Sequence, residues 1–209
     1  MAIITISRQF GAGGRTLGTR LTSELSYSLA DEYLIEMVAQ KANVSSELVK
    51  MLEKEAGGTL QRYISGLNLI RRRYIDPLID KRSYIDGHRY VKLLHDIVIK
   101  LAEEDNVIIL GRGGQYILGD HPNALHILLI AQERDRVRFM QDNYDLDRAQ
   151  AEQVIFRQDK ARKNLFRFFG KEDYDQPRLY HAVLNMSRLN MECAVELVVK
   201  MTDSLHCPA

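Results

Sequence analysis

A glycine-rich segment near the N-terminus has the residue types that bind phosphate. Gly11-Ala12-Gly13-Gly14-Arg15-Thr16 follows a short apolar run and precedes leucines at four-residue spacing. Glycines allow successive backbone N–H groups to point into one loop, and the start of a helix adds roughly half a positive charge. Guanidinium groups at Arg8 and Arg15 would add donors that match phosphate oxygens. The segment therefore predicts a phosphate-binding loop.

The segment is close to the motif G-x-x-x-x-G-K-[ST] but departs from it where the motif carries its charge. Arg8 stands at the first glycine of the motif and Gly14 at the lysine. Arg8 or Arg15 is then the candidate replacement for the lysine, and loss of ATP affinity in Arg15→Ala would identify Arg15. Two alternatives stay open. The glycines serve strand–helix packing alone, or they begin a dinucleotide-binding G-x-G-x-x-G turn whose third glycine is here Thr16.

Four short apolar runs predict the strands that position this loop. Each run is separated from the next by a helical pattern, which favours parallel strands joined by right-handed crossovers. The runs are residues 3–6, 107–110, 126–130 and 182–185. They predict an α/β fold with a central parallel sheet.

Helical patterns fill the intervals between the strands. The clearest covers residues 87–101, where Asp86 is a candidate cap. Between about residues 31 and 85 the pattern is helical but more polar, which predicts an insertion that either binds the acceptor or only packs. The last helix is expected to begin near Leu189 and to bury one apolar face, made of Cys193, Ala194, Leu197, Val198 and Met201.

Composition narrows the class of protein further. The 209 residues are 45% hydrophobic, enough for one α/β domain, and the formal net charge of +1 gives no argument for a nucleic-acid partner. Cys193 and Cys207 have no metal-ligand spacing and fit a reducing compartment. No leader or membrane-spanning run is evident. We therefore expect a cytoplasmic protein without a membrane or nucleic-acid partner.

Five segments in order resemble the bacterial cytidylate kinase-like family. They are GAGGRTLG after the first strand, VIILGRGG, HILLIAQERDRVRFM, RQDKARKN and AVLNMSRLNMECAVELV. The resemblance extends from residue 3 to about residue 201. It implies a three-layer P-loop NTPase-type fold, with residues 1–209 forming a single domain that has an insertion at about 31–85 and a lid at about 157–170.

The resemblance also implies roles for individual residues. Thr16 would help to hold Mg²⁺, and Arg112 and Asp159 would bind the acceptor. Lys160 and Arg162 would close from the lid as catalytic cations. Arg15 is the third candidate catalytic cation, because of its place within the phosphate loop. The donor phosphates would lie on the loop residues, namely Arg8, Gly11, Ala12, Gly13, Gly14, Arg15 and Thr16.

Two departures from the family pattern concern the second glycine segment. Leu110 and Gly113 stand where the family has aspartates, so the resemblance does not imply recognition of a cytosine base. The expected activity is transfer of a phosphoryl group from ATP, with Mg²⁺, to a nucleotide or small phosphate-bearing acceptor. Phosphoryl transfer needs in-line positioning and neutralisation of charge, which basic lid residues supply. The alternative is a nucleotide-binding sensor with degraded catalysis, and homodimer formation through the insertion is also open.

Overall fold

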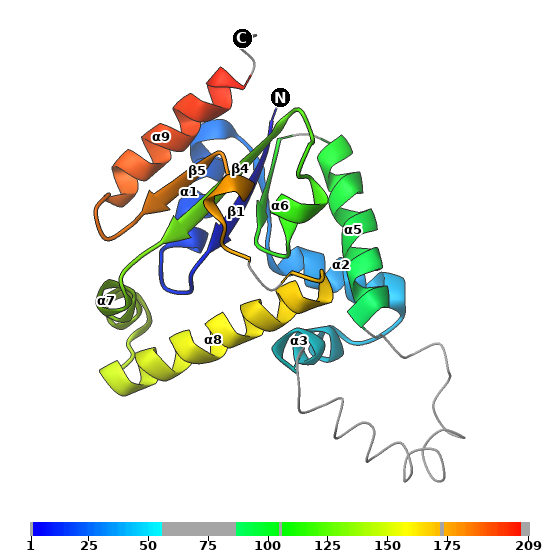
Figure 1. Ribbon diagram of the computed structural model, residues 1–209, viewed down its shortest axis with the longest axis horizontal. Coiled ribbons are helices and arrows are strands. Elements are labelled where there is room, and N and C mark those ends of the chain that lie inside the picture. The colour runs from blue at the N-terminus through cyan, green and yellow to red at the C-terminus, as the bar shows by residue number, and fades with distance from the viewer. Residues whose placement is uncertain (1, 56–86, 105, 172–173, 206–209) are drawn as a thin grey trace. The chain divides into compact units, whose positions relative to one another are not determined.

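A five-stranded parallel sheet forms the centre of the fold (Figure 1). The computed structural model describes residues 2–55, 87–104, 106–171 and 174–205. The strand order is β2-β3-β1-β4-β5. The strands are β1 (Ile3–Arg8), β2 (Ser28–Ala30), β3 (Val107–Leu110), β4 (Ala124–Ile130) and β5 (Ala182–Asn185). The four predicted strands are confirmed, and β2 is a strand that the sequence did not predict.

Helices follow most of the strands, as the alternating pattern predicted. The long helices are α1 (Gly14–Leu25), α2 (Glu32–Ala42), α3 (Ser46–Glu55), α5 (Gly87–Glu103), α7 (Glu133–Tyr144), α8 (Arg148–Phe168) and α9 (Met191–Ser204). Two short ones are α6 (Gly114–Ile117) and the 3₁₀ turn Pro177–Leu179. The predicted cap Asp86 and the later part of the predicted insertion, up to residue 85, lie outside the described residues.

The main hydrophobic core lies between the sheet and helices α1 and α9. Leu17 and Leu21 of α1 and Val198 of α9 are fully buried against strand side chains such as Ile4 and Ile127. Burial of side chains of this size contributes roughly 1.5–3 kcal/mol each. This packing fixes the start of α1, and with it the glycine-rich segment, at the end of β1.

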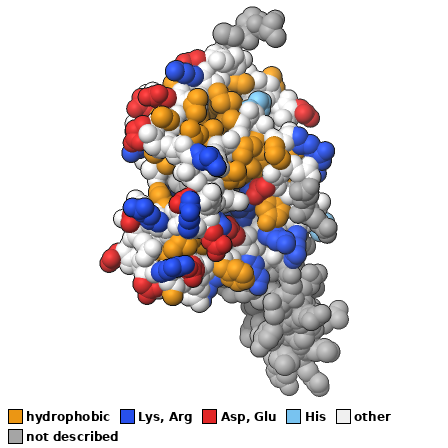
Figure 2. All heavy atoms as spheres, turned by 60° about the vertical axis from the view of Figure 1, so that its left-hand side comes forward, with side chains coloured by type: hydrophobic (Ala, Val, Ile, Leu, Met, Phe, Trp, Pro, Cys, Tyr) orange, Lys and Arg blue, Asp and Glu red, His pale blue; other side chains and the backbone are white. Residues whose placement is uncertain are grey.

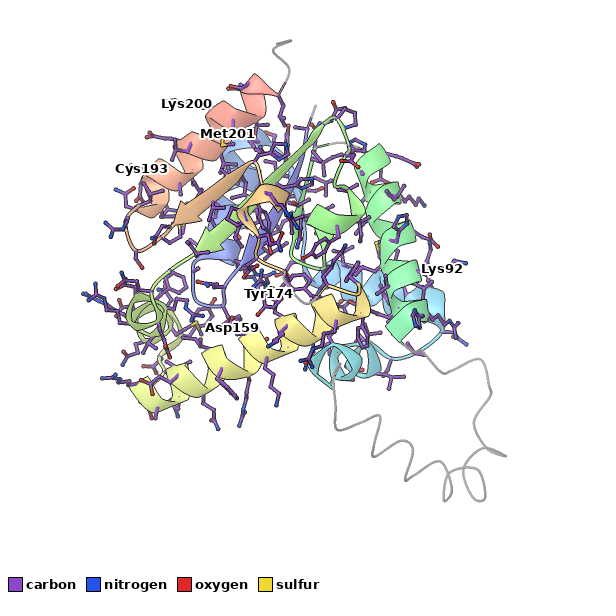
Figure 3. The ribbon with its side chains drawn as sticks, viewed as in Figure 1. Lys92, Asp159, Tyr174, Cys193, Lys200 and Met201 are labelled. Carbon is purple, nitrogen blue, oxygen red and sulfur yellow. The ribbon has the colours of Figure 1, made fainter. Side chains whose placement is uncertain are left out.

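The buried face of α9 differs from the predicted one. Ala194, Val195 and Val198 are buried and Leu197 is 41% exposed. Cys193 is exposed (Figure 3). Apolar residues surround most of this helix, so their spacing does not select one face. The prediction that Cys193 and Leu197 belong to the core was therefore wrong.

The chain divides into two compact units. One contains residues 1–31, 98–159 and 175–209, and includes the whole sheet; the other contains residues 32–97 and 160–174. In the second unit the Tyr90 hydroxyl is bonded to Glu53, and Arg89 reaches the Ala42 carbonyl. The interpretation of the chain as one domain with an insertion and a lid stays a prediction.

Candidate functional site

The glycine-rich segment forms a tight turn between β1 and α1. Gly11 and Gly13 have φ angles of 84° and 83°, a left-handed conformation that favours glycine. The Ala12 amide donates to the Gln9 carbonyl over 3.1 Å and closes the turn. Because α1 begins at Gly14 and its N-cap is a glycine, the N-cap supplies no side chain to the first N–H groups of the helix. Those groups are donors of the kind that bind phosphate.

A second glycine turn follows β3, the strand beside β1. Gly111, Arg112 and Gly113 have consecutive φ angles of 74°, 55° and 73°. The Gly111 amide donates to the Ile6 carbonyl of β1 over 2.9 Å, so both turns leave the same edge of the sheet. An arginine in this conformation costs roughly 1–2 kcal/mol, and such strained residues cluster at functional sites. The structure thus brings the predicted acceptor residue Arg112 next to the predicted phosphate loop.

The side chain of Arg8 extends from the first glycine turn to the second. A Cβ atom added to Gly14 would lie 2.8 Å from Cγ and 3.1 Å from Cδ of Arg8. A Cβ atom added to Gly111 would collide with Nη1 of the same arginine. Both positions therefore accommodate Arg8 because they are glycines.

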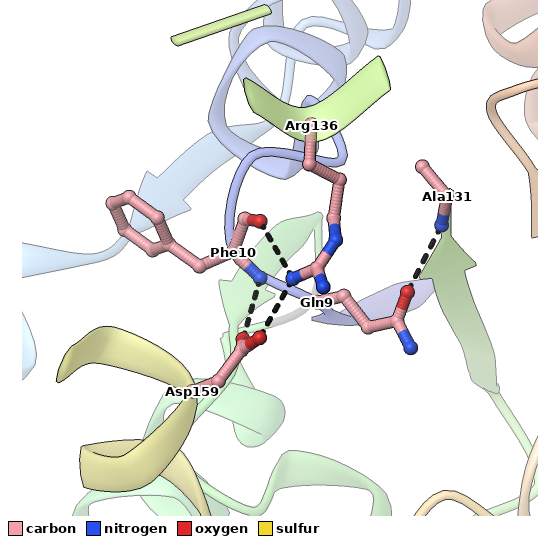
Figure 4. Close-up of polar contacts among 5 residues, drawn as sticks. All are labelled: Gln9, Phe10, Ala131, Arg136 and Asp159. Carbon is pink, nitrogen blue, oxygen red and sulfur yellow. Dashed lines mark hydrogen bonds and ion pairs between the residues drawn. The ribbon is translucent and has the colours of Figure 1, made fainter. Parts of the chain in front are cut away.

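Asp159 and Arg136 hold the backbone just before the phosphate loop (Figure 4). Asp159, which comes from α8 (Figure 3), accepts a hydrogen bond from the Phe10 amide over 3.0 Å. Arg136 of α7 donates from Nη1 to Asp159 Oδ2 over 2.6 Å and to the Phe10 carbonyl over 3.2 Å. A further bond joins the Ala131 amide to the Gln9 side chain over 3.0 Å. We refer to Asp159, Arg136 and Phe10 as the loop clamp.

Arg136 is a member of the site that sequence reasoning missed. It stands among several arginines in the segment Glu133–Phe139, and its spacing does not distinguish it from them. Burial does, because its side chain is 12% exposed whereas that of Arg134 is 80% exposed. The difference in burial arises because α7 packs against the phosphate loop. The packing is close at Gly11, where an added Cβ atom would lie 3.0 Å from the Arg136 backbone oxygen.

Arg15 and Thr16 occupy the first turn of α1. The Arg15 side chain is 62% exposed, with Nε 3.8 Å from a carboxylate oxygen of Asp31. Arg15 and Thr16 line one side of a hollow of about 300 Å³, and Tyr144 contributes to its lining. The role of Arg15 toward a bound phosphate stays a prediction.

Lys160 and Arg162, the predicted lid cations, belong to the second compact unit. Lys160 is exposed. The Arg162 guanidinium lies over two rings of the same unit, 4.9 Å from the centroid of Phe166 and 5.3 Å from that of Tyr174. These cation–π contacts give Arg162 a defined place on α8. The proposed closure of both residues over a phosphate stays a prediction.

A buried histidine forms hydrogen bonds near the second glycine turn. His126 of β4 places Nδ1 2.7 Å from the Thr5 hydroxyl and Nε2 3.3 Å from the Leu118 carbonyl. A carbonyl only accepts, so Nε2 carries the proton and Nδ1 accepts from Thr5. Burial lowers the pKa of His126 below its usual value, and the nearby His181 lowers it further. The neutral ring thus connects β1 and β4 to the end of α6, the helix that starts at the second turn.

Gln115 lies directly behind the second turn and is 3% exposed. Its Nε2 has no hydrogen-bond partner among the residues that the structure describes. A buried amide nitrogen without an acceptor costs about 1–3 kcal/mol. It is therefore a candidate donor to a ligand oxygen at this turn.

The charges on the surface are mixed in sign. On the face drawn in Figure 2, Lys and Arg side chains lie interspersed with Asp and Glu side chains. No group of three or more His, Cys, Asp or Glu side chains suited to a metal occurs in the described part of the chain. Among the described helices, none has the length and apolar character needed to cross a membrane.

The fold and the two turns define the class of protein. A gluconokinase from Sinorhizobium meliloti is similar over 98% of this chain and 93% of its own, with 10% identity and a TM-score of 0.51. A sugar kinase from Janibacter covers 97% and 95%, with 12% identity and a TM-score of 0.53. An uncharacterized protein from Eubacterium ventriosum covers 98% and 99%, with 18% identity and a TM-score of 0.63. The fold is that of the P-loop kinases.

Sequence comparison identifies the family within this class. Residues 3–188 match the cytidylate kinase-like family, and the chain belongs to it. Comparison with curated proteins gives no match. Family and fold together make this a kinase-like nucleotide-binding protein.

Proposed function

We propose that this protein transfers the γ-phosphoryl group of ATP to a nucleotide or another small phosphate-bearing acceptor. The observation that supports it most strongly is the pair of glycine turns at the ends of neighbouring strands, the first with uncapped helix N–H groups and the second with Arg112 at positive φ. In parallel α/β folds, ligands bind at this carboxyl edge of the strands. The two adjacent turns are the proposed places for the donor and the acceptor.

The proposed roles of the residues follow from the turns. The loop from Gly11 to Thr16 binds the β- and γ-phosphates, and Arg112 with Gln115 binds the acceptor. An acceptor oxygen attacks the γ-phosphorus, the bond from phosphorus to the bridging oxygen breaks, and ADP leaves with that electron pair. A hydroxyl acceptor gives its proton to water, whereas a phosphate acceptor is already anionic. Lys160 and Arg162 neutralise charge on the transferred group.

Mg²⁺ would be carried to the site mainly by the nucleotide. Mg²⁺ usually keeps several waters and binds through one or two protein ligands together with substrate phosphates. With Gly14 at the lysine position, Arg15 occupies the Ser/Thr position of the motif and Thr16 follows it. The half-buried Thr16 hydroxyl in the first turn of α1 is then the neighbouring hydroxyl proposed for that limited role. The ion would supply positive charge to the phosphates when bound.

A nucleotide-binding sensor without catalysis is the second candidate. It is favoured by glycine at the lysine position, Gly14, and by Leu110 and Gly113 where carboxylates would otherwise stand. Loss of these groups weakens catalysis more than it weakens binding, because the helix N-terminus still holds phosphate.

One assay separates the two candidates. ADP formation from ATP and Mg²⁺ is measured across nucleoside monophosphates and small phosphate-bearing alcohols, with an acceptor-free control. The kinase proposal predicts acceptor-dependent turnover that Arg162→Ala reduces by about 100-fold or more. Arg148→Ala is a matched control, because Arg148 is 80% exposed and pairs with Glu152 on the same helix. Thermal stabilisation by ATP without turnover on any acceptor supports the sensor instead.

A further inference from the structure

We infer that Arg8 supplies the positive charge that a phosphate loop ordinarily takes from its lysine. This inference rests on the proposed function, since it concerns binding of the donor phosphates. Arg8 occupies the first position of the G-x-x-x-x-G-K-[ST] pattern, and Gly14 occupies the lysine position. The sequence left Arg8 and Arg15 as equal candidates.

The space above Gly14 is filled by Arg8. Its Cβ, Cγ and Cδ lie 3.2, 2.8 and 3.1 Å from the point where a Cβ atom of residue 14 would be. A lysine at position 14 would start its side chain in that same volume. With Arg8 in this conformation the two side chains do not both fit, so Arg8 occupies the space in which a lysine side chain at position 14 would begin.

The guanidinium end of Arg8 lies between the two glycine turns. Its Nη1 is against Gly111, where any Cβ atom would collide with it. Gly111 is bonded through its amide to Ile6 and directly precedes Arg112. The charge is therefore placed between the loop proposed for the donor and the turn proposed for the acceptor, where the transferred phosphoryl group must pass.

Arg15 is placed differently. Its side chain is 62% exposed and its Nε lies 3.8 Å from the Asp31 carboxylate. A guanidinium this exposed contributes less to phosphate binding than a half-buried one, because water screens its charge. Arg8, by contrast, is half-buried and packs on the loop backbone. A planar guanidinium also suits bidentate contact with phosphate oxygens.

The decisive variant is Arg8→Met, which keeps an unbranched side chain over Gly14 and removes the charge. Affinities for ATP, ADP and AMP are measured by displacement of a fluorescent ATP analogue, and folding is checked by thermal unfolding. We expect the affinity for ATP and ADP to fall roughly 10- to 150-fold, the range for a lost hydrogen bond to a charged group. AMP, which lacks the β- and γ-phosphates, should lose much less. Arg15→Met should lose less than Arg8→Met.

A rescue variant keeps the test independent of folding defects. Arg8→Gly combined with Gly14→Lys rebuilds the G-x-x-x-x-G-K spacing and should bind ATP better than Arg8→Gly alone. Arg148→Met is the matched control for loss of one exposed arginine, with ATP affinity expected within about twofold of the parent.

The outcomes separate this inference from the proposed function. If the parent protein binds ATP and Arg8→Met binds it equally well, the role of Arg8 is refuted while the proposed function stands. A greater loss in Arg15→Met than in Arg8→Met refutes it as well. If the parent binds neither ATP nor ADP, the proposed function itself fails and the inference falls with it.

Discussion

Replacing Asp159 with asparagine tests whether the loop clamp stabilises the phosphate loop. The carboxylate accepts bonds from the Phe10 amide over 3.0 Å and from Arg136 over 2.6 Å. Asparagine keeps an oxygen for Phe10 but has no charge for the guanidinium. With side chains 12% and 35% exposed, the pair lies between the limits of about 0–1 kcal/mol for exposed pairs and about 3–5 kcal/mol for broken buried pairs. We expect Asp159→Asn to lower the free energy of unfolding by about 1–2 kcal/mol.

The assay is urea unfolding of a double-mutant cycle. Asp159→Asn, Arg136→Met and the double variant are compared with the parent. The dependence of the unfolding free energy on urea concentration must be the same for all four proteins, so that differences in the midpoint report differences in stability. A coupling energy of about 1–2 kcal/mol is expected between the two positions. Asp135→Asn is the control, because its partner Arg134 is 80% exposed, and we expect a change within about 0.5 kcal/mol. A coupling energy below about 0.3 kcal/mol would refute the reasoning.

The same variant distinguishes a clamp from an acceptor-binding role for Asp159. A clamp orders the phosphate loop, so Asp159→Asn should weaken ATP binding in parallel with the loss of stability. If Asp159 contacts the acceptor, the variant raises the acceptor KM and leaves stability and ATP affinity unchanged. That second pattern would restore the role that the family resemblance implies and would contradict the clamp.

Two further predictions concern the second turn and its support. The lowered pKa of His126 means that below about pH 6.5 the unfolded chain binds more protons than the folded one, so stability falls as pH decreases. His126→Gln should flatten this fall in urea unfolding between pH 8 and 5, and an unchanged pH slope would contradict it. The free energy of unfolding of Arg112→Gly should be about 0.5–1 kcal/mol higher than that of Arg112→Ala, because glycine adopts a φ of 55° without strain. Equal stabilities would show that the turn is not strained.

Most of the sheet could be predicted from the sequence because its inner strands are short and mostly apolar. Residues 107–110 are buried at every position. A strand that is buried on both faces has an uninterrupted run of apolar residues, which distinguishes it from a surface segment. β2 was missed for the opposite reason, since Ser28–Ala30 is a three-residue edge strand with only one buried residue. Its pairing with β3 depends on a neighbour far along the chain.

The candidate site was predictable only where backbone conformation restricts residue type. Gly11, Gly13 and Gly111 mark positive φ angles, and those positions were recognised as turns from their glycines. The clamp by Arg136 could not be predicted, because its contact with Phe10 joins residues separated by 126 positions. Long-range contacts between a side chain and the backbone leave no local periodicity in the sequence.

The path of Arg8 across Gly14 and Gly111 links two positions of the phosphate loop with a third that lies far along the sequence. Residues at 8, 14 and 111 share one small volume, so a change at one limits the others. Family members with lysine at the position of Gly14 should carry a small residue at the position of Arg8, and a member with a bulky residue at the position of Gly111 should lack arginine there. Covariation among these three positions would then distinguish phosphate loops with lysine from phosphate loops with arginine. A search for the lysine alone would miss the loops with arginine.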